Sequence, residues 1–239
     1  MAHQLEIVGT DCAQMGIVRN NTQEWMFFQS YPFIQSELLA HVGACVHPNP
    51  KRALITGGFD TQIAFELLKY EGLHVDFVQE DHAMLENLHA FLPQFAETKA
   101  HARFKLYDKI LDLDLQPYDI LISLSTPNAH QVDGLQRMLN PKGLMLLSVP
   151  NPLLEQEAFK GALTSLQGCA QILMPFNTPY APTPQVYLFA SKHYHPLADM
   201  LLQKIDMLDG LRYYNAEIHH AAFAQPQWLK GACARLLKN

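Results

Sequence analysis

From residue 51 onward, short apolar runs alternate with stretches that have the periodicity of helices. The apolar runs predict strands at 53–56, 75–78, 104–107, 120–123, 144–149, 171–174 and 185–190. Helical patterns predict helices at 61–70, 83–92 and about 153–166. Continuous apolar runs are typical of strands buried on both faces, and alternating strands and helices indicate a parallel sheet covered by helices. We therefore expect an α/β fold for this part of the chain.

The first 36 residues follow another pattern. Short alternating segments at 5–8, 16–18 and 24–28 lie between turn-forming residues, which predicts a small antiparallel sheet. Ser36 is expected to cap a helix that starts at Glu37 and ends before the HPNP sequence at 47–50. Residues 196–239 read as a helix, an irregular YYN turn and another helix. The chain is thus predicted to have a β-domain at 1–36 and an α/β domain at 37–239.

Composition excludes several classes of protein. Of 239 residues, 49% are hydrophobic and 17% charged, which is not typical of a disordered chain. No apolar stretch reaches the ~18 to 20 residues of a membrane-spanning helix, and the MAHQLEIVGTD start lacks the pattern of a signal peptide. A net charge of −6 disfavours a nucleic-acid binder. The chain has four cysteines, Cys12, Cys45, Cys169 and Cys233, and none of them form a CxxC pair. This spacing argues against a metal site with thiolate ligands and favours a reduced cytoplasmic protein.

The junction ALITGGFDTQIAFELLKY carries the most informative local chemistry. Gly57 and Gly58 directly follow a predicted buried strand and allow the backbone to approach a ligand closely. About 20 residues further on, where an acidic residue commonly binds ribose, the sequence reads Gln79-Glu80-Asp81. GGFD is not GxGxxG, and Asp60 would repel phosphates, so a nucleoside with a cationic tail fits better than a dinucleotide. The alternative is a plain tight turn.

Three segments carry distinctive motifs: SELLAHVGACVHPNPKRALITGGFDTQIAFELLKY at 36–70, YDILISLSTP at 118–127 and YYNAEIHHAAFAQP at 213–226. Together they resemble the spermidine synthase (polyamine aminopropyltransferase) family. The resemblance implies a Rossmann-like domain of the class I methyltransferase type behind a small N-terminal β-domain. It also implies transfer of the aminopropyl group of decarboxylated S-adenosylmethionine to putrescine, giving spermidine and methylthioadenosine. Further implications are a homodimer and no cofactor beyond the nucleoside co-substrate.

The resemblance places residues around the nucleoside. Asp60 falls on the Asp that holds the ammonium end of the nucleoside substrate, within a loop that includes Gly57 and Gly58. Asp108 falls on the Asp that binds the adenine amino group. Gln79 replaces the ribose-binding Glu, and Glu80 or Asp81 is a candidate substitute.

On the amine side, the resemblance implies contacts from four residues. Glu37 belongs to the pocket helix and Gln35 lies just before it. Tyr213 belongs to the YYN turn, and Tyr180 to a segment that lines the amine pocket. Tyr180 is also taken as a catalytic residue.

The catalytic Asp of the family falls on Leu124, which we place beside the nucleoside. Leucine cannot accept a proton, so another group has to do so, and the candidates are Asp133, Glu37 and His130. Three interpretations stay open. The chain is an aminopropyltransferase with a rearranged amine site, a transferase with another acceptor or a methyltransferase-like activity, or a binding protein that has lost turnover.

Overall fold

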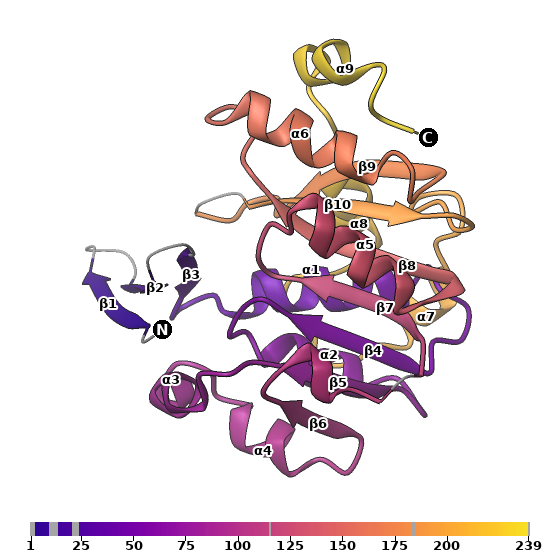
Figure 1. Ribbon diagram of the computed structural model, residues 1–239. Coiled ribbons are helices and arrows are strands. Elements are labelled where there is room, and N and C mark those ends of the chain that lie inside the picture. The colour runs from indigo at the N-terminus through magenta and orange to yellow at the C-terminus, as the bar shows by residue number, and fades with distance from the viewer. Residues whose placement is uncertain (1–2, 10–13, 21–23, 115, 183–184, 239) are drawn as a thin grey trace.

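A computed structural model describes residues 3–9, 14–20, 24–114, 116–182 and 185–238 (Figure 1). Its centre is a seven-stranded sheet with the order β6-β5-β4-β7-β8-β10-β9. The strands are β4 (Arg52–Thr56), β5 (His74–Val78), β6 (Phe104–Tyr107), β7 (Tyr118–Ser123), β8 (Leu139–Val149), β9 (Ile172–Asn177) and β10 (Val186–Ser191). Each predicted strand is present.

Five of these strands pair in parallel, from β6 through β4 to β8. The departure from the expected parallel sheet is β10, which is antiparallel to both β8 and β9. Only eight residues, 178–185, join β9 to β10. A parallel crossover needs a dozen or more residues, so this connection reverses the strand.

Helices cover both faces of the sheet (Figure 1). One face, centred on Ile55, Phe77 and Ile122, packs against α1 (Phe33–Ala44), α2 (Gln62–Leu68), α7 (Leu202–Asp206) and α8 (Ala216–Ala222). The other, centred on Leu54 and Leu121, packs against α5 (Ala129–Arg137), α6 (Gln156–Leu166) and α9 (Gln227–Cys233). Shorter helices are α3 (His82–Asn87), η1 (Leu88–Ala90), α4 (Phe95–Ala100) and η2 (Ile110–Asp112). No described helix is long and apolar enough to cross a membrane.

The N-terminal strands form the expected separate antiparallel sheet beside the main one (Figure 1). They are β1 (Gln4–Gly9), β2 (Gln14–Arg19) and β3 (Glu24–Phe28). The inner face presents Val18, Trp25 and Phe27, which form an apolar cluster with Phe59 and side chains of α3, η1 and α4. The small sheet is therefore packed on the loop that follows β4.

One predicted helix start is wrong. The helix α1 begins at Phe33, after Pro32 at the N-cap position, and not at Glu37. Proline suits the start of a helix because its φ is already fixed near the helical value, here −65°. Ser36 lies inside the first turn and donates its hydroxyl hydrogen to the Pro32 carbonyl at 3.2 Å.

Candidate active site

The loop after β4 requires both of its glycines. Gly57 has a φ of +80°, and a Cβ there would lie 2.3 Å from Ser125 Oγ. A Cβ on Gly58 would lie 2.7 Å from the Cβ of Leu124. The carboxyl ends of β4 and β7 therefore meet without room for side chains, and this contact forms the floor of a cavity.

That cavity, which we call the glycine-loop cavity, opens at the carboxyl ends of β4, β5 and β7 and has a volume of ≈ 430 Å³. This size lies in the range of small-molecule sites. Six of the residues predicted around a nucleoside line it: Gly57, Gly58, Gln79, Glu80, Asp108 and Leu124. The N-terminal sheet supplies part of the opposite wall, including His3, Asn20 and Trp25. The structure brings these residues together, while their contacts with a nucleoside stay a prediction.

Gln79 is held in place from both ends of its amide. Its Nε2 donates to the Gly58 carbonyl at 2.9 Å, and its Oε1 accepts from the Asp81 backbone N–H at 3.0 Å. The Asp81 carboxylate caps α3 by accepting from the Met84 N–H at 3.0 Å. Partial burial works to raise the pKa of Asp81, but hydrogen bonds from His3 and Met84 outweigh it and lower the pKa. Of the two candidate substitutes for the ribose-binding Glu, Glu80 lines the cavity and Asp81 supports its wall.

Asp108 follows β6 at the outer rim of the same cavity. Its side chain is 64% exposed, and its Oδ1 lies 3.0 Å from His82 Nε2 at the start of α3. The adenine-binding position that the resemblance implies is therefore open to solvent in this structure.

Asp60, the seventh residue predicted at the nucleoside, lines a second cavity. We call it the aromatic cavity, because Trp25, Phe27 and Tyr31 form much of its wall. It is narrow, at ≈ 30 Å³, and it is also lined by Gln35, whose contact with an amine stays a prediction. Trp25 lines both cavities, so they are neighbours on either side of the 57–60 loop.

Asp60 is 3% exposed. Burial, with a smaller contribution from the negative charge of Glu66, raises the pKa of Asp60 to about 7. The Gln62 backbone N–H, which donates to Asp60 Oδ1 at 3.1 Å, opposes this rise. Near neutral pH this carboxyl can therefore either hold or release a proton.

Glu37 does not line either cavity, contrary to the amine-pocket position that we expected for it. It is 2% exposed, and its carboxylate accepts backbone N–H groups from Arg212 (3.0 Å), Tyr213 (2.8 Å) and Tyr214 (2.8 Å). With three donors on two oxygens, the carboxylate is an anchor for the YYN turn. The same contacts argue against Glu37 as the missing proton acceptor.

Tyr213 and Tyr180 are also outside both cavities. The Tyr213 hydroxyl donates to the Pro179 carbonyl at 2.6 Å and so ties the YYN turn to the segment after β9. Thr178 and Ala181 of that segment line the aromatic cavity. Tyr180 itself is 89% exposed, with a φ of +60°, so its ring points away from the cavity that it was expected to line.

The other candidates for a replacement base, Asp133 and His130, line neither cavity. Asp133 is exposed on α5. The pKa of nearby Cys169 is raised, mainly by burial of the thiol and to a smaller extent by the negative charge of Asp133. His130 is exposed at the start of the same helix. Leu124 is buried under the glycine loop. Among the described residues, Asp60 is the carboxyl that lines the aromatic cavity.

Sequence reasoning missed the contribution of the N-terminal sheet. Trp25 and His3 line the glycine-loop cavity, and Phe59 packs between them, with ring centroids 4.9 Å from His3 and 6.1 Å from Trp25. The available signal was Phe59, an aromatic residue directly after the two glycines of the loop, because a buried ring in a ligand loop needs an apolar partner.

The described part of the chain holds three free buried thiols, Cys45, Cys169 and Cys233, while Cys12 lies outside it. No group of three or more His, Cys, Asp or Glu residues that could hold a metal ion occurs among the described residues.

The strand order with β10 reversed, the glycine loop after β4 and the cavity at the carboxyl ends define a Rossmann-like fold of the methyltransferase type. Residues 32–201 match the model of the Spermine/spermidine synthase domain. The chain belongs to the spermine/spermidine synthase family, as its sequence motifs indicated, which is a family of transferases in polyamine biosynthesis.

Similar proteins agree with this assignment. A polyamine aminopropyltransferase of Helicobacter pylori (strain HPAG1) is 40% identical over 206 residues, which are 86% of this chain and 78% of the relative. One from Agathobacter rectalis is 30% identical over 230 residues, covering 87% and 80%. The crystal structure of spermidine synthase from Thermotoga maritima has a TM-score of 0.77 at 23% identity, covering 96% of this chain and 86% of that one. A spermidine synthase in complex with the transition state analogue AdoDATO has a TM-score of 0.79 at 23% identity, covering 96% and 87%.

Proposed function

We propose that the protein transfers the aminopropyl group of decarboxylated S-adenosylmethionine to a diamine, putrescine, and so forms spermidine and methylthioadenosine. The observation that carries the proposal is the placement of Asp60: a buried carboxyl in an aromatic cavity that adjoins the glycine-loop cavity. Aromatic faces and a carboxylate are the groups that bind alkylammonium ions. The complex of a spermidine synthase of the same fold with the transition state analogue AdoDATO supports the same class of ligands.

The reaction is a displacement at carbon. The lone pair of a neutral amine attacks the aminopropyl carbon attached to sulfur, the C–S bond breaks, and its electron pair neutralises the sulfonium to give the thioether. One proton is released, because the diamine arrives as an ammonium ion and the product nitrogen keeps only the protons of a secondary ammonium. The sulfonium is an activated leaving group, so the proposal needs no metal or organic cofactor. Positioning the two reactants is the main task of the protein.

We assign Asp60 two tasks in this proposal. When ionised, its carboxylate holds an ammonium group at the junction of the cavities, and it can receive the proton that the attacking amine loses. A pKa of about 7 suits a proton acceptor that works near neutral pH. The nucleoside would bind in the glycine-loop cavity, against Gly57, Gly58 and Gln79. A diamine is larger than the ≈ 30 Å³ of the aromatic cavity, so its binding has to displace part of the wall.

The test is an end-point assay by mass spectrometry. Purified protein is incubated with decarboxylated S-adenosylmethionine and, separately, putrescine, cadaverine or spermidine. We expect methylthioadenosine and spermidine with putrescine, and loss of both products in Asp60→Asn. Thr61→Ser, a neutral change at the next buried residue, should keep the parent rate and serves as the matched control.

Leu124 favours a second candidate, a binding protein that has lost turnover, because a buried leucine stands where the family has its catalytic Asp. Tight binding of decarboxylated S-adenosylmethionine with no product from any amine would establish this candidate. Tighter binding of S-adenosylmethionine than of its decarboxylated form would instead indicate a methyltransferase-like activity.

We also propose a cytoplasmic homodimer. Light scattering of the purified chain would test the dimer, and cell fractionation would test the location.

A further inference from the structure

His3 connects the N-terminal sheet to the main domain at the glycine-loop cavity. The side chain of His3 is 8% exposed, and its Nδ1–H donates to Asp81 Oδ2 at 2.8 Å. Asn20 Nδ2–H donates to His3 Nε2 at 2.9 Å. One neutral tautomer of the imidazole satisfies both bonds. The ring also packs edge-on against Phe59, with the centroids 4.9 Å apart.

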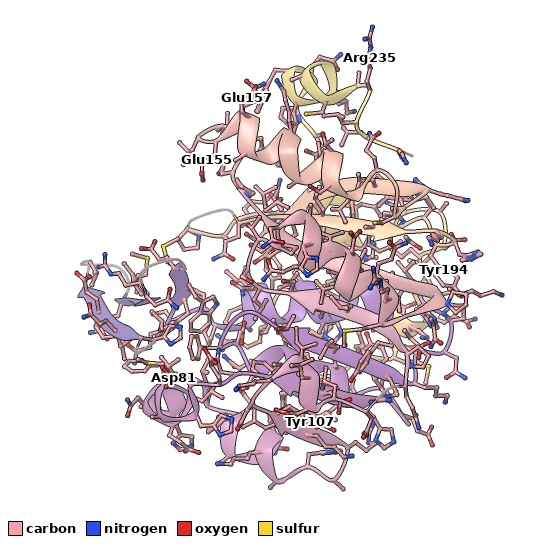
Figure 2. The ribbon with its side chains drawn as sticks, in the orientation of Figure 1. Asp81, Tyr107, Glu155, Glu157, Tyr194 and Arg235 are labelled. Atoms are coloured by element: carbon pink, nitrogen blue, oxygen red, sulfur yellow. The ribbon has the colours of Figure 1, made fainter. Side chains whose placement is uncertain are left out.

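The hydrogen bonds continue from His3 into the floor of the cavity. Asp81 Oδ1 accepts from the Met84 N–H and holds α3, while the Asp81 N–H donates to Gln79 Oε1 at 3.0 Å. Gln79 Nε2 then donates to the Gly58 carbonyl at 2.9 Å. Figure 2 labels Asp81 at the start of α3, beside the N-terminal sheet. An imidazole more than fifty residues before the glycine loop is thus linked to that loop through the carboxylate and backbone N–H of Asp81 and the side chain of Gln79.

We propose that His3 is a positioning residue for the nucleoside: it fixes Asp81, and through Asp81 it fixes the Gln79 amide and the Gly58 carbonyl at the cavity. The inference rests on the proposed function in one respect, namely that the glycine-loop cavity binds a nucleoside. Fixed donors and acceptors lower the entropy lost when a ligand binds. Without the imidazole, the Asp81 carboxylate keeps its bond to Met84, but its second oxygen keeps only the longer bond from the backbone N–H of residue 3, at 3.4 Å.

Two substitutions separate the bond to Asp81 from the rest of the ring. His3→Ala removes both hydrogen bonds, whereas His3→Asn places an amide N–H near the position of Nδ1 and keeps a donor for Asp81. His74→Ala changes an exposed histidine at the opposite end of β5 and is the control. Calorimetry with methylthioadenosine measures affinity, and hydrogen exchange of the free protein follows the Asp81 and Met84 amides. Steady-state kinetics separates the KM of each substrate from kcat.

For His3→Ala we expect affinity for methylthioadenosine to fall about tenfold, the effect of one charge-assisted hydrogen bond. The Asp81 and Met84 amides should exchange faster, and the KM of the nucleoside should rise while that of the amine stays the same. His3→Asn should stay within about threefold of the parent. His74→Ala should match the parent in each measurement.

Unchanged exchange in His3→Ala would overturn the inference, as would unchanged affinity or an asparagine variant as weak as the alanine one. In those cases product formation by the parent would still leave the proposed function standing. A parent that neither binds methylthioadenosine nor forms product would overturn the proposed function and this inference together.

Discussion

Replacing Asp60 by asparagine should make the protein more stable, and increasingly so at higher pH. Asparagine has nearly the same shape, and its Oδ1 can still accept the Gln62 N–H that the carboxylate accepts at 3.1 Å. The substitution removes a carboxyl group, and burial raises the pKa of that group to about 7. A carboxyl buried to this degree is thus a source of instability, and the proposed binding of an ammonium group would be the reason to keep it.

The magnitude follows from the two states of the chain. An aspartate in an unfolded chain has a pKa of about 3.9, so between pH 4 and 7 the unfolded chain has released the proton that the folded protein still holds. The free energy of unfolding therefore falls as pH rises through this window, and above pH 7 it stays low. The pKa of about 7 in the folded protein corresponds to a total of about 4 kcal/mol. Between pH 5 and pH 9, the stability gained by Asp60→Asn should grow by about 3 kcal/mol.

Urea denaturation of parent and variant at pH 5, 7 and 9 measures this difference. Thr61→Ser changes the neighbouring buried side chain without removing a charge, and its difference from the parent should not vary with pH. A constant difference between Asp60→Asn and the parent from pH 5 to pH 9 would show that Asp60 is ionised throughout. The account of its burial and of its protonation would then be refuted.

Three further changes test the surroundings of the site. Glu37→Gln replaces an acceptor oxygen by a donor in front of three backbone N–H groups, so the free energy of unfolding in urea should fall by about 2–4 kcal/mol; an unchanged value would contradict the anchoring role. Tyr213→Phe removes the bond to the Pro179 carbonyl and should raise the KM of the amine about threefold to tenfold without changing nucleoside affinity in calorimetry; a rise in the nucleoside Kd alone would refute this. Gly58→Ala places a methyl group 2.7 Å from the Leu124 Cβ and should lower the unfolding free energy by about 1–3 kcal/mol. Adding Leu124→Gly removes both the Cβ and the Cδ1 (2.8 Å) that the new methyl group meets, so it should destabilise the Gly58→Ala protein less than it destabilises the parent; an equal loss in both would show that the contact is not the cause.

The sequence was sufficient to locate the strands because their signal is local. Runs such as ALIT at 53–56 are apolar on both faces, and burial under two layers of helices demands that pattern. The start of α1 was missed because two local rules compete there, and Pro32 precedes the serine that we took for the cap. The reversal of β10 was not anticipated because it follows from the length of a connection and not from the strand itself.

The site was predictable where it depends on the ends of parallel strands. Gly57, Gln79 and Asp108 follow β4, β5 and β6, and neighbouring strands bring their ends to one edge. Residues held by distant segments were not predictable in the same way. Glu37 meets backbone groups about 175 positions away, and nothing in its own segment distinguishes an anchor from a ligand contact.

The position of Trp25 gives the protein an internal optical reporter. The chain has two tryptophans; Trp25 is 7% exposed in the wall shared by both cavities, while Trp228 is 42% exposed on α9. A buried indole emits at shorter wavelength than a hydrated one, so the two contributions differ in colour. In a Trp228→Phe protein all tryptophan fluorescence would come from Trp25 in the wall shared by the two cavities. Binding of a ligand in either cavity could then be followed by this fluorescence without a label.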